Sequence, residues 1–315
     1  MDTKGFTEYS EEKGHIAKTI KANIKYIEQF FAKVKKEDTQ ITKPDVLKYL
    51  EYLKTHTKQQ NKSRQNCLAA LNHYFIFLLR NGLIAENPCF LLKIRGIKRK
   101  TLYKIFTAEE LDTLCDNYYE LFVRNFDDSR HRSDHQRREA ALCKQRNALI
   151  LSIFIYQGAT TGEVNKIELE DIDLIKAKIK IRGGRHSNER ILLLNASQIG
   201  FLMYYLQNIR PQLLEYHTNE TNKLFLALPE NNQQTTNSNG LVSAYVHLTK
   251  QVKTINPKFL NFKQVRASVI TCWLKNYGLR KTQYMAGHRY VSSTESYLSN
   301  NLENLIDDIS KLHPF

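Results

Sequence analysis

Four side chains between residues 263 and 297 have the types and spacing needed to cut a phosphodiester bond. Lys263 and Arg266 lie three residues apart, so both cations fall on one face of a helix. His288 follows Gly287, and Tyr297 comes nine residues later. A tyrosine oxygen can attack phosphorus while arginine and histidine bind the non-bridging oxygens. The pattern favours attack of Tyr297 on a DNA phosphodiester with the 5′-hydroxyl leaving. Side-chain cations supply the charge, so neither a metal nor a cofactor is expected.

Patterns typical of several other enzyme classes are absent from the sequence. There is no G-x-x-x-x-G-K-[ST] segment for a nucleotide and no H-E-x-x-H segment for zinc. There is also no G-x-S-x-G segment for a serine hydrolase. The five cysteines are far apart and form no C-x-x-C pair, so we expect neither a disulfide framework nor a zinc cluster.

The charge of the chain favours a polyanionic partner. The 315 residues contain 47 Lys and Arg against 32 Asp and Glu, a net charge of +15. The excess is uneven, because residues 1–106 hold 21 basic and 10 acidic residues. A basic field of this size attracts nucleic acid. We therefore expect double-stranded DNA as the partner.

Six basic residues are concentrated in the stretch KIRGIKRKTLYK, residues 93–104. This stretch predicts a basic linker over 98–106 that joins two domains and can lie along a phosphate backbone. A solvated, flexible connector is the plainer alternative, and both can hold. The DNA-binding residues predicted here and in the hairpin below are Lys93, Arg95, Lys98, Arg99, Lys100, Lys104 and Arg182.

The sequence gives no sign of a membrane-spanning segment. No run of about 18 uncharged apolar residues occurs, and the N-terminal stretch MDTKGFTEYSEEKG lacks the apolar core of a signal peptide. We expect a cytoplasmic protein associated with the nucleoid, with no membrane partner.

Residues 1–97 are predicted to form a helical, DNA-binding domain. Apolar residues recur at helical spacing from Ile20 to Val34 and from Val46 to Leu53, where Pro44 suits a first helical turn. A third helix is expected from about Ser63, and a short fourth helix after Gly82. Four helices in about 100 residues form a small bundle.

Residues 107–315 are predicted to form a second domain that is mostly helical. It begins at the capping box Thr107–Glu110. The charged stretch 123–146 is expected to be a mobile excursion, and the apolar run 148–157 a buried helix. The overall fold class is mostly α with a small antiparallel β-sheet.

A β-hairpin is expected within residues 172–194. Ile175, Ala177, Ile179 and Ile181 alternate with lysines, Gly183-Gly184 interrupts the run, and 191–194 form the returning strand.

The C-terminal pattern resembles that of the tyrosine recombinases, the phage-integrase and Xer-like family. The family's motifs H-x-L-R, L-G-H and T-T-x-x-Y correspond in this chain to KQVR at 263–266, AGH at 286–288 and STESY at 293–297. The segment GATTGE at 158–163 with DID at 171–173 resembles the family's G-L-R-x-S-E and D-x-D block. GRHSNERILLL at 184–194 resembles the family's hairpin. The order and spacing of these motifs match the family, and the resemblance covers almost the whole chain. It implies a helical core-binding domain, a linker and a catalytic domain.

The resemblance carries six catalytic positions onto this chain, and three of them hold different residues. Arg266, His288 and Tyr297 match. The family's first arginine falls on Thr160, which can donate a hydrogen bond but has no charge. The first histidine falls on Lys263.

The family's hairpin lysine, its general acid, falls on Arg185 or, as an alternative, on Arg182. An arginine can bind phosphate with two hydrogen bonds but is a poor proton donor. Lys263 is a candidate for the acid or for the charge lost at Thr160. Loss of one charge stabiliser typically costs about 3–4 kcal/mol in the transition state. The neighbouring Glu163 is interpreted as structural, orienting a cation.

The resemblance implies site-specific recombination through a 3′-phosphotyrosyl intermediate, either in integration or excision of a mobile element or in DNA inversion. An alternative is a recombinase-derived protein that binds and synapses DNA with impaired catalysis, and a third is a type IB-like topoisomerase. A C-terminal helix over 300–313 is predicted from Leu302, Leu305, Ile309 and Leu312. It either closes its own domain or docks on a neighbouring protomer in a tetramer on paired sites.

Overall fold

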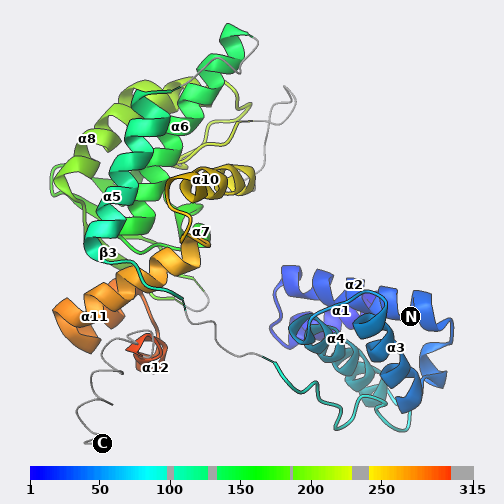
Figure 1. The fold of residues 1–315 in the computed structure, drawn as a ribbon. Coiled ribbons are helices and arrows are strands. Elements are labelled where there is room, and N and C mark those ends of the chain that lie inside the picture. Colours follow the sequence, from blue (N-terminus) through cyan, green and yellow to red (C-terminus); the bar gives the residue numbers. More distant parts are fainter. Residues whose placement is uncertain (98–102, 127–132, 185–186, 229–240, 299–315) are drawn as a thin grey trace, which may run out of the picture. The chain divides into compact units, whose positions relative to one another are not determined.

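The computed structural model describes residues 1–97, 103–126, 133–184, 187–228 and 241–298 (Figure 1). The chain divides into two compact units, Met1–Thr101 and Leu102–Phe315. This boundary falls inside the stretch 98–106 for which a linker was expected. Lys93, Arg95 and Lys104 are exposed, whereas Lys98, Arg99 and Lys100 lie outside the described residues.

The first unit is a small helical bundle. Its helices are α1 (Thr3–Glu12), α2 (Ala17–Val34), α3 (Lys43–Thr55) and α4 (Asn61–Arg80), with a 3₁₀ turn η1 at Asp38–Gln40. Helix α3 begins as expected, with a capping box between Thr42 and Asp45 and a proline in its first turn. Phe30 of α2 and Phe75 of α4 are fully buried at its centre. The helices expected from Ile20, Val46 and Ser63 are therefore confirmed.

The short helix expected after Gly82 is not formed. The described residues 81–97 run through turns and extended chain instead. The Asn87 side chain accepts a hydrogen bond from the Cys89 amide at 2.8 Å, and Leu91 has a positive φ of 60°. Both features, together with Pro88, favour a turn over a helix.

The fourth helix of the bundle is α1, at the N-terminus. Asp2 caps it by accepting a hydrogen bond from the Gly5 amide at 2.8 Å. Phe6 is 1% exposed and meets the rings of His73, Tyr74 and Phe77 edge-on. A single buried aromatic residue anchors this otherwise polar segment, so its hydrophobic periodicity was too weak to predict a helix.

The second unit is mostly helical around a three-stranded sheet. Helices α5 (Ala108–Tyr119) and α6 (Asp134–Tyr156) lie side by side next to α8 (Ala196–Tyr204) in Figure 1. Further helices of this unit are the π-helices η2 (Glu120–Arg124) and η4 (Tyr205–Ile209), α9 (Arg210–Leu214), α10 (Leu241–Ile255) and α11 (Phe262–Ala286). Helix α11 is kinked at Gly278, whose φ is 72°. The short elements around the site are α7 (Thr161–Val164), η3 (Leu169–Asp171) and α12 (Val291–Glu295). The predicted fold class, mostly α with a small antiparallel sheet, is confirmed.

The sheet has the order β1-β2-β3, with strands β1 (Ile172–Asp173), β2 (Lys178–Ile181) and β3 (Arg190–Leu193), all antiparallel. The expected hairpin is present, but its first strand is shorter than predicted. Ile175 is 97% exposed, because the chain turns there and Lys176 donates its amide to the Asp173 carboxylate at 2.9 Å. Ile179 and Ile181 are fully buried and fix the inner face of the sheet.

The charged stretch 123–146 is largely helical, which corrects the expectation of a mobile excursion. Ser133 caps α6 by accepting from the Gln136 amide at 3.2 Å, and Arg138 contacts Gln212 and Glu215. Arg146, 3% exposed, donates to the Leu226 carbonyl at 2.7 Å. These tertiary partners hold a segment whose composition alone resembles a solvated loop. Residues 127–132 lie outside the described part of the chain.

Within the described residues, no helix is long and apolar enough to cross a lipid bilayer.

Candidate active site

Arg266, His288 and Tyr297 are positioned by one continuous stretch, α11 to α12. Asn261 caps α11 by accepting hydrogen bonds from the amides of residues 263 and 264. The helix ends at Gly287, whose φ is +67°. A Cβ on Gly287 would lie 2.6 Å from Nη1 of Arg190, so only glycine lets the backbone approach this arginine.

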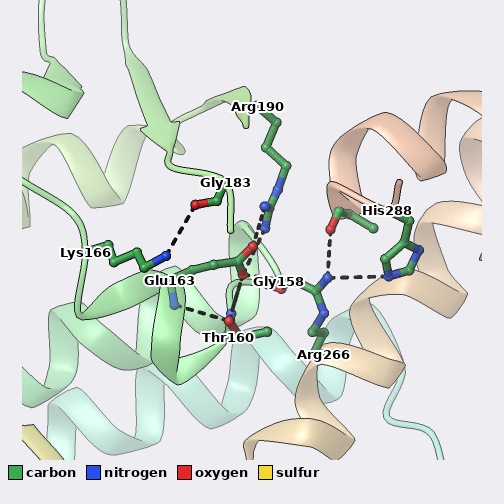
Figure 2. Close-up of polar contacts among 9 residues, drawn as sticks. Gly158, Thr160, Glu163, Lys166, Gly183, Arg190, Arg266 and His288 are labelled. Atoms are coloured by element: carbon green, nitrogen blue, oxygen red, sulfur yellow. Dashed lines mark hydrogen bonds and ion pairs between the residues drawn. The ribbon is translucent and has the colours of Figure 1, made fainter. Parts of the chain in front are cut away.

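The Arg266 guanidinium is fixed by four hydrogen-bond partners. Nη1 donates to the Gly158 carbonyl and, at 3.5 Å, to Oε2 of Glu163. Nη2 donates to the Ala286 carbonyl at 2.7 Å and lies 3.5 Å from Nε2 of His288 (Figure 2). The side chain is 12% exposed. Burial lowers the pKa of Arg266, and the Glu163 carboxylate opposes this shift.

Glu163 lies between two arginines. Arg190 of β3, whose side chain is fully buried, donates to Oε1 at 2.6 Å and to Oε2 at 3.3 Å. Burial alone would raise the pKa of Glu163, but the hydrogen bonds and charges of Arg190 and Arg266 lower it. One carboxylate thus faces two guanidinium groups, which leaves an excess of one positive charge. Such an excess favours an incoming anion.

His288 is held in a neutral state beside this cluster. Burial, followed by the charges of Arg266 and Arg190, lowers its pKa to about 4. Its Nδ1 lies 2.8 Å from Oγ1 of Thr294 in α12. Because arginine can only donate hydrogen bonds, Nε2 of His288 is the acceptor toward Arg266. The ring proton is therefore on Nδ1, which donates a hydrogen bond to Thr294.

Tyr297 follows α12 and stacks on the histidine. The ring centroids of His288 and Tyr297 are 5.6 Å apart, with an angle of 15° between the planes. The Tyr297 amide donates to the Thr294 carbonyl at 2.9 Å. The nearby Tyr297 side chain also counters the lowering of the Arg266 pKa, although less than Glu163 does. The structure therefore brings together the three residues that match the family pattern.

Thr160 reaches the same cluster, but as a helix cap. Its hydroxyl accepts from the Glu163 amide at 3.2 Å and donates to the Glu163 carboxylate at 3.0 Å. This reciprocal capping box starts α7. Thr160 is joined to Arg266 through Glu163, and it adds no charge. The orienting role expected of Glu163 is consistent with these contacts.

The hairpin meets the site at His288, where Ser187 pairs with His288 as an isolated β-bridge and the Asn188 amide donates to the Gly287 carbonyl at 2.8 Å. Arg185 lies outside the described residues.

Arg182, the other arginine considered for the hairpin position, points to an acidic group. It forms ion pairs with Glu168 at 2.9 Å, Glu170 at 2.6 Å and Asp171 at 2.7 Å. Its charge is therefore balanced locally, and DNA contact by Arg182 stays a prediction.

Lys263 lies in the first turn of α11 and is exposed. Among the described residues its ammonium group makes no contact with Arg266, His288 or Tyr297. The structure thus separates the two members of the expected cation pair, one buried and one at the surface. A catalytic role for Lys263 stays a prediction.

Sequence reasoning missed two members of the site. Arg190 is the second arginine of the GRHSNER segment, and Thr294 precedes the tyrosine by three residues. Two sequence signals could have identified these residues. One is the spacing of Thr294 from His288, and the other is the position of Arg190 at the start of an apolar strand. Neither signal specifies the partner, because Glu163 is 27 residues from Arg190 and contacts it only in the folded chain.

The comparisons with known proteins agree on one family. Residues 3–83 match the family described as "Phage integrase, N-terminal SAM-like domain". The tyrosine recombinase XerD of Staphylococcus haemolyticus is 31% identical over 254 residues, which cover 80% of this chain and 77% of that protein. The chain belongs to the tyrosine recombinase family. A second relative of this family, the tyrosine recombinase XerC of Natranaerobius thermophilus, is 25% identical over 282 residues, covering 87% and 84% of the two chains.

Solved structures of tyrosine recombinases share the fold. A lambda integrase dimer bound to a COC′ core site matches with a TM-score of 0.61 at 13% identity, covering 93% of each chain. The XerH recombinase in a post-cleavage complex with its difH substrate matches with a TM-score of 0.60 at 17% identity, covering 90% of this chain and 76% of XerH. The first unit is thus a SAM-like core-binding domain and the second a recombinase catalytic domain.

Proposed function

We propose that this chain is a site-specific recombinase that cuts and rejoins duplex DNA through a 3′-phosphotyrosyl link at Tyr297. Integration or excision of a mobile element is the setting that we favour, with DNA inversion as the next. The observation that carries the proposal is the cluster of Arg266, His288 and Tyr297, in which a buried guanidinium and a neutral imidazole adjoin a tyrosine.

The charge of the cluster suits the transition state of phosphoryl transfer. Arg266 and Arg190 face a single carboxylate, Glu163, so the site holds a positive excess before DNA arrives. A phosphate bound at Arg266 would compete with the long 3.5 Å contact to Glu163, while the carbonyls of Gly158 and Ala286 keep the guanidinium in place. Preorganised donors of this kind stabilise developing charge without reorganisation.

His288 is suited to take the tyrosine proton. It is neutral at pH 7, and its Nε2 is the unprotonated nitrogen. In the proposed reaction the Tyr297 oxygen bonds to phosphorus, its proton passes to Nε2, and the bond from phosphorus to the 5′-oxygen breaks. Attack by the 5′-hydroxyl of a partner duplex reverses these steps. Bond energy is kept in the covalent link, so no ATP is consumed.

A DNA-binding protein with impaired catalysis is the second candidate. The observation that favours it is Thr160, which serves as a neutral cap where the family has an arginine. The +15 charge would still support binding to DNA. The two candidates differ in one product, a covalent protein–DNA complex.

For assembly, we propose a homotetramer on paired DNA sites, as the family resemblance implies. The segment proposed to dock on a neighbouring protomer, 300–313, lies outside the described residues. A chain ending at Ser299 that still assembles on paired sites would contradict docking through this segment.

The test works even when the target sequence is unknown. Wild type and Tyr297→Phe are expressed in cells, non-covalent complexes are removed with detergent, and DNA still attached to the protein is sequenced. The proposal predicts discrete sites in wild type and none in the variant. Tyr290→Phe is a matched control, because Tyr290 is 66% exposed and precedes α12. Absence of covalent DNA in wild type, with retained DNA binding, would favour the second candidate.

A further inference from the structure

The cations around the β2–β3 hairpin differ in how their charge is balanced. Lys180 pairs with Glu189 at 3.1 Å, and Arg182 with an acidic group. Lys223 pairs with Glu168 at 2.6 Å. Lys166 and Lys178 have no carboxylate partner within the described part of the chain. Of these two, Lys166 contacts the turn of the hairpin, because its ammonium group donates to the Gly183 carbonyl at 3.4 Å.

Lys166 is fixed to the site through its backbone. It lies two residues after the end of α7, and its amide donates to the Glu163 carbonyl at 2.9 Å. The residue therefore belongs to the same short segment that supplies Thr160 and Glu163. Figure 2 shows the Lys166 side chain extending from this segment toward the hairpin, while the Glu163 side chain meets Arg190.

The hairpin that Lys166 touches leads directly to His288. Gly183 starts the turn, and a Cβ there would lie 2.8 Å from the Ser187 carbonyl, so the turn closes tightly only with glycine. Ser187 then pairs with His288. A Cβ on Gly184 would lie 3.5 Å from Nζ of Lys166, so the ammonium lies against both glycines. Lys166 thus lies at the base of the loop that borders the histidine.

The proposed reaction needs a proton donor that the described cluster lacks. The departing 5′-oxygen must gain a proton, because an alkoxide is a poor leaving group in water. Arginine side chains hold their protons too tightly to serve. His288 is neutral, and its one ring N–H donates a hydrogen bond to Thr294. A lysine ammonium group carries a proton that it can release.

We propose that Lys166 is the general acid that protonates the leaving 5′-oxygen. This inference rests on the proposed function. The ammonium leaves its long contact with the Gly183 carbonyl and donates to the 5′-oxygen as the bond from phosphorus to that oxygen breaks. Lys166 becomes a neutral amine, the DNA gains a 5′-hydroxyl, and the tyrosine proton goes to His288. In the rejoining step each proton returns, so the cycle balances.

The test compares two leaving groups on one recovered target site. The full chain acts on a nicked duplex whose scissile bond carries either a 5′-oxygen or a 5′-sulfur. Thiols are far more acidic than alcohols, so a thiolate leaves without a proton. Lys166→Ala is expected to slow cleavage of the oxygen substrate by about 10²–10⁴-fold and to cleave the sulfur substrate at close to the wild-type rate. Lys166→Arg should show the same pattern, since it keeps the charge but not the acid.

Lys253→Ala is the matched control, since Lys253 is also an exposed lysine in the same unit and lies in α10. It should cleave both substrates at close to the wild-type rate. The inference is overturned if Lys166→Ala cleaves the oxygen substrate normally, if it is equally slow on both substrates, or if Lys263→Ala shows the rescue by sulfur. Failure of the wild type on both substrates would instead overturn the proposed function, and the inference with it.

Discussion

The two sides of the site are built in different ways. Arg266, His288 and Tyr297 come from one stretch of 32 residues, and they contact one another directly. On the other side, Thr160 and Glu163 form a helix cap, and the hairpin cations Lys180 and Arg182 are paired with carboxylates. The first side therefore offers the charge of Arg266 and the nucleophile Tyr297 to a ligand. On the second side, most groups form hydrogen bonds and ion pairs with one another.

Glu163 connects the two sides. It caps α7 with Thr160 and holds both Arg190 and Arg266. The difference between the sides indicates that the second side mainly orients the first. Thr160 stands where the family pattern has an arginine, and it still caps α7, because an N-cap needs only a side-chain oxygen such as a hydroxyl.

Removal of the carboxylate that joins the two sides should have the largest effect. Glu163→Gln leaves the Arg190 guanidinium, which is fully buried, without its negative partner. We expect a loss of about 3–5 kcal/mol in the free energy of unfolding, measured by urea denaturation at pH 7. Glu189→Gln is the control, because its ion pair with Lys180 is exposed and should contribute less than about 1 kcal/mol. Equal stability of the two variants would contradict the connecting role.

The charge of the first side should matter next most. Arg266→Lys keeps one positive charge, but a single ammonium cannot serve the carbonyls of Gly158 and Ala286 together. We expect the rate of covalent complex formation to fall by about 10²–10³-fold. Lys253→Ala, at an exposed lysine of α10, should stay close to the wild-type rate. A large loss in Lys263→Ala would assign the missing charge or the acid to Lys263.

The neutral state of His288 predicts a pH dependence of stability. Its pKa is about 4 in the folded chain, against about 6.5 when unfolded. Above about pH 6.5 the imidazole is neutral in both states, and the free energy of unfolding has its full value. As the pH falls toward 4 the free energy of unfolding declines, because only the unfolded state takes up the proton. With part of the ring near solvent, we expect a loss of about 1–2 kcal/mol.

Unfolding measured from pH 7 to pH 4 checks this, with His288→Gln as the comparison. The variant should lack the part of the decline that belongs to the imidazole. The same slope in both proteins would show that His288 is not held neutral by Arg266 and Arg190.

The cap on the second side should give the smallest effect. Thr160→Ala removes the hydroxyl that accepts from the Glu163 amide and should cost about 1 kcal/mol of stability. Thr160→Ser should retain most of it. Thr161→Ala is the control, since this exposed residue belongs to the same helix but is not its cap. A cleavage defect in Thr160→Ala beyond its loss of stability would indicate that the hydroxyl also binds the phosphate.

The first side was predictable from the sequence because it is local. A helix kinked at Gly278, the left-handed Gly287 and a short second helix set the spacing of Arg266, His288 and Tyr297 within one stretch. The first unit was predictable wherever apolar periodicity was strong, as in α2 and α4, but not at α1, where Phe6 alone carries the burial.

The second side was less predictable, because its contacts span long sequence separations. The carboxylate of Glu163 meets Arg190 across 27 residues, and Lys166 meets Gly183 across 17. Arg182 looked like a free phosphate ligand, but three acids that precede it in the chain neutralise it. Sequence patterns give the residue types here, but only the fold selects the partners.

The central claim is that Tyr297 forms the bond to DNA. The most direct measurement digests covalent complexes from cells with nuclease and protease and locates the nucleotide-bearing peptide by mass spectrometry. The account predicts a phosphate-linked nucleotide on Tyr297. A nucleotide on another residue, or recombination that proceeds without any such peptide, would contradict it.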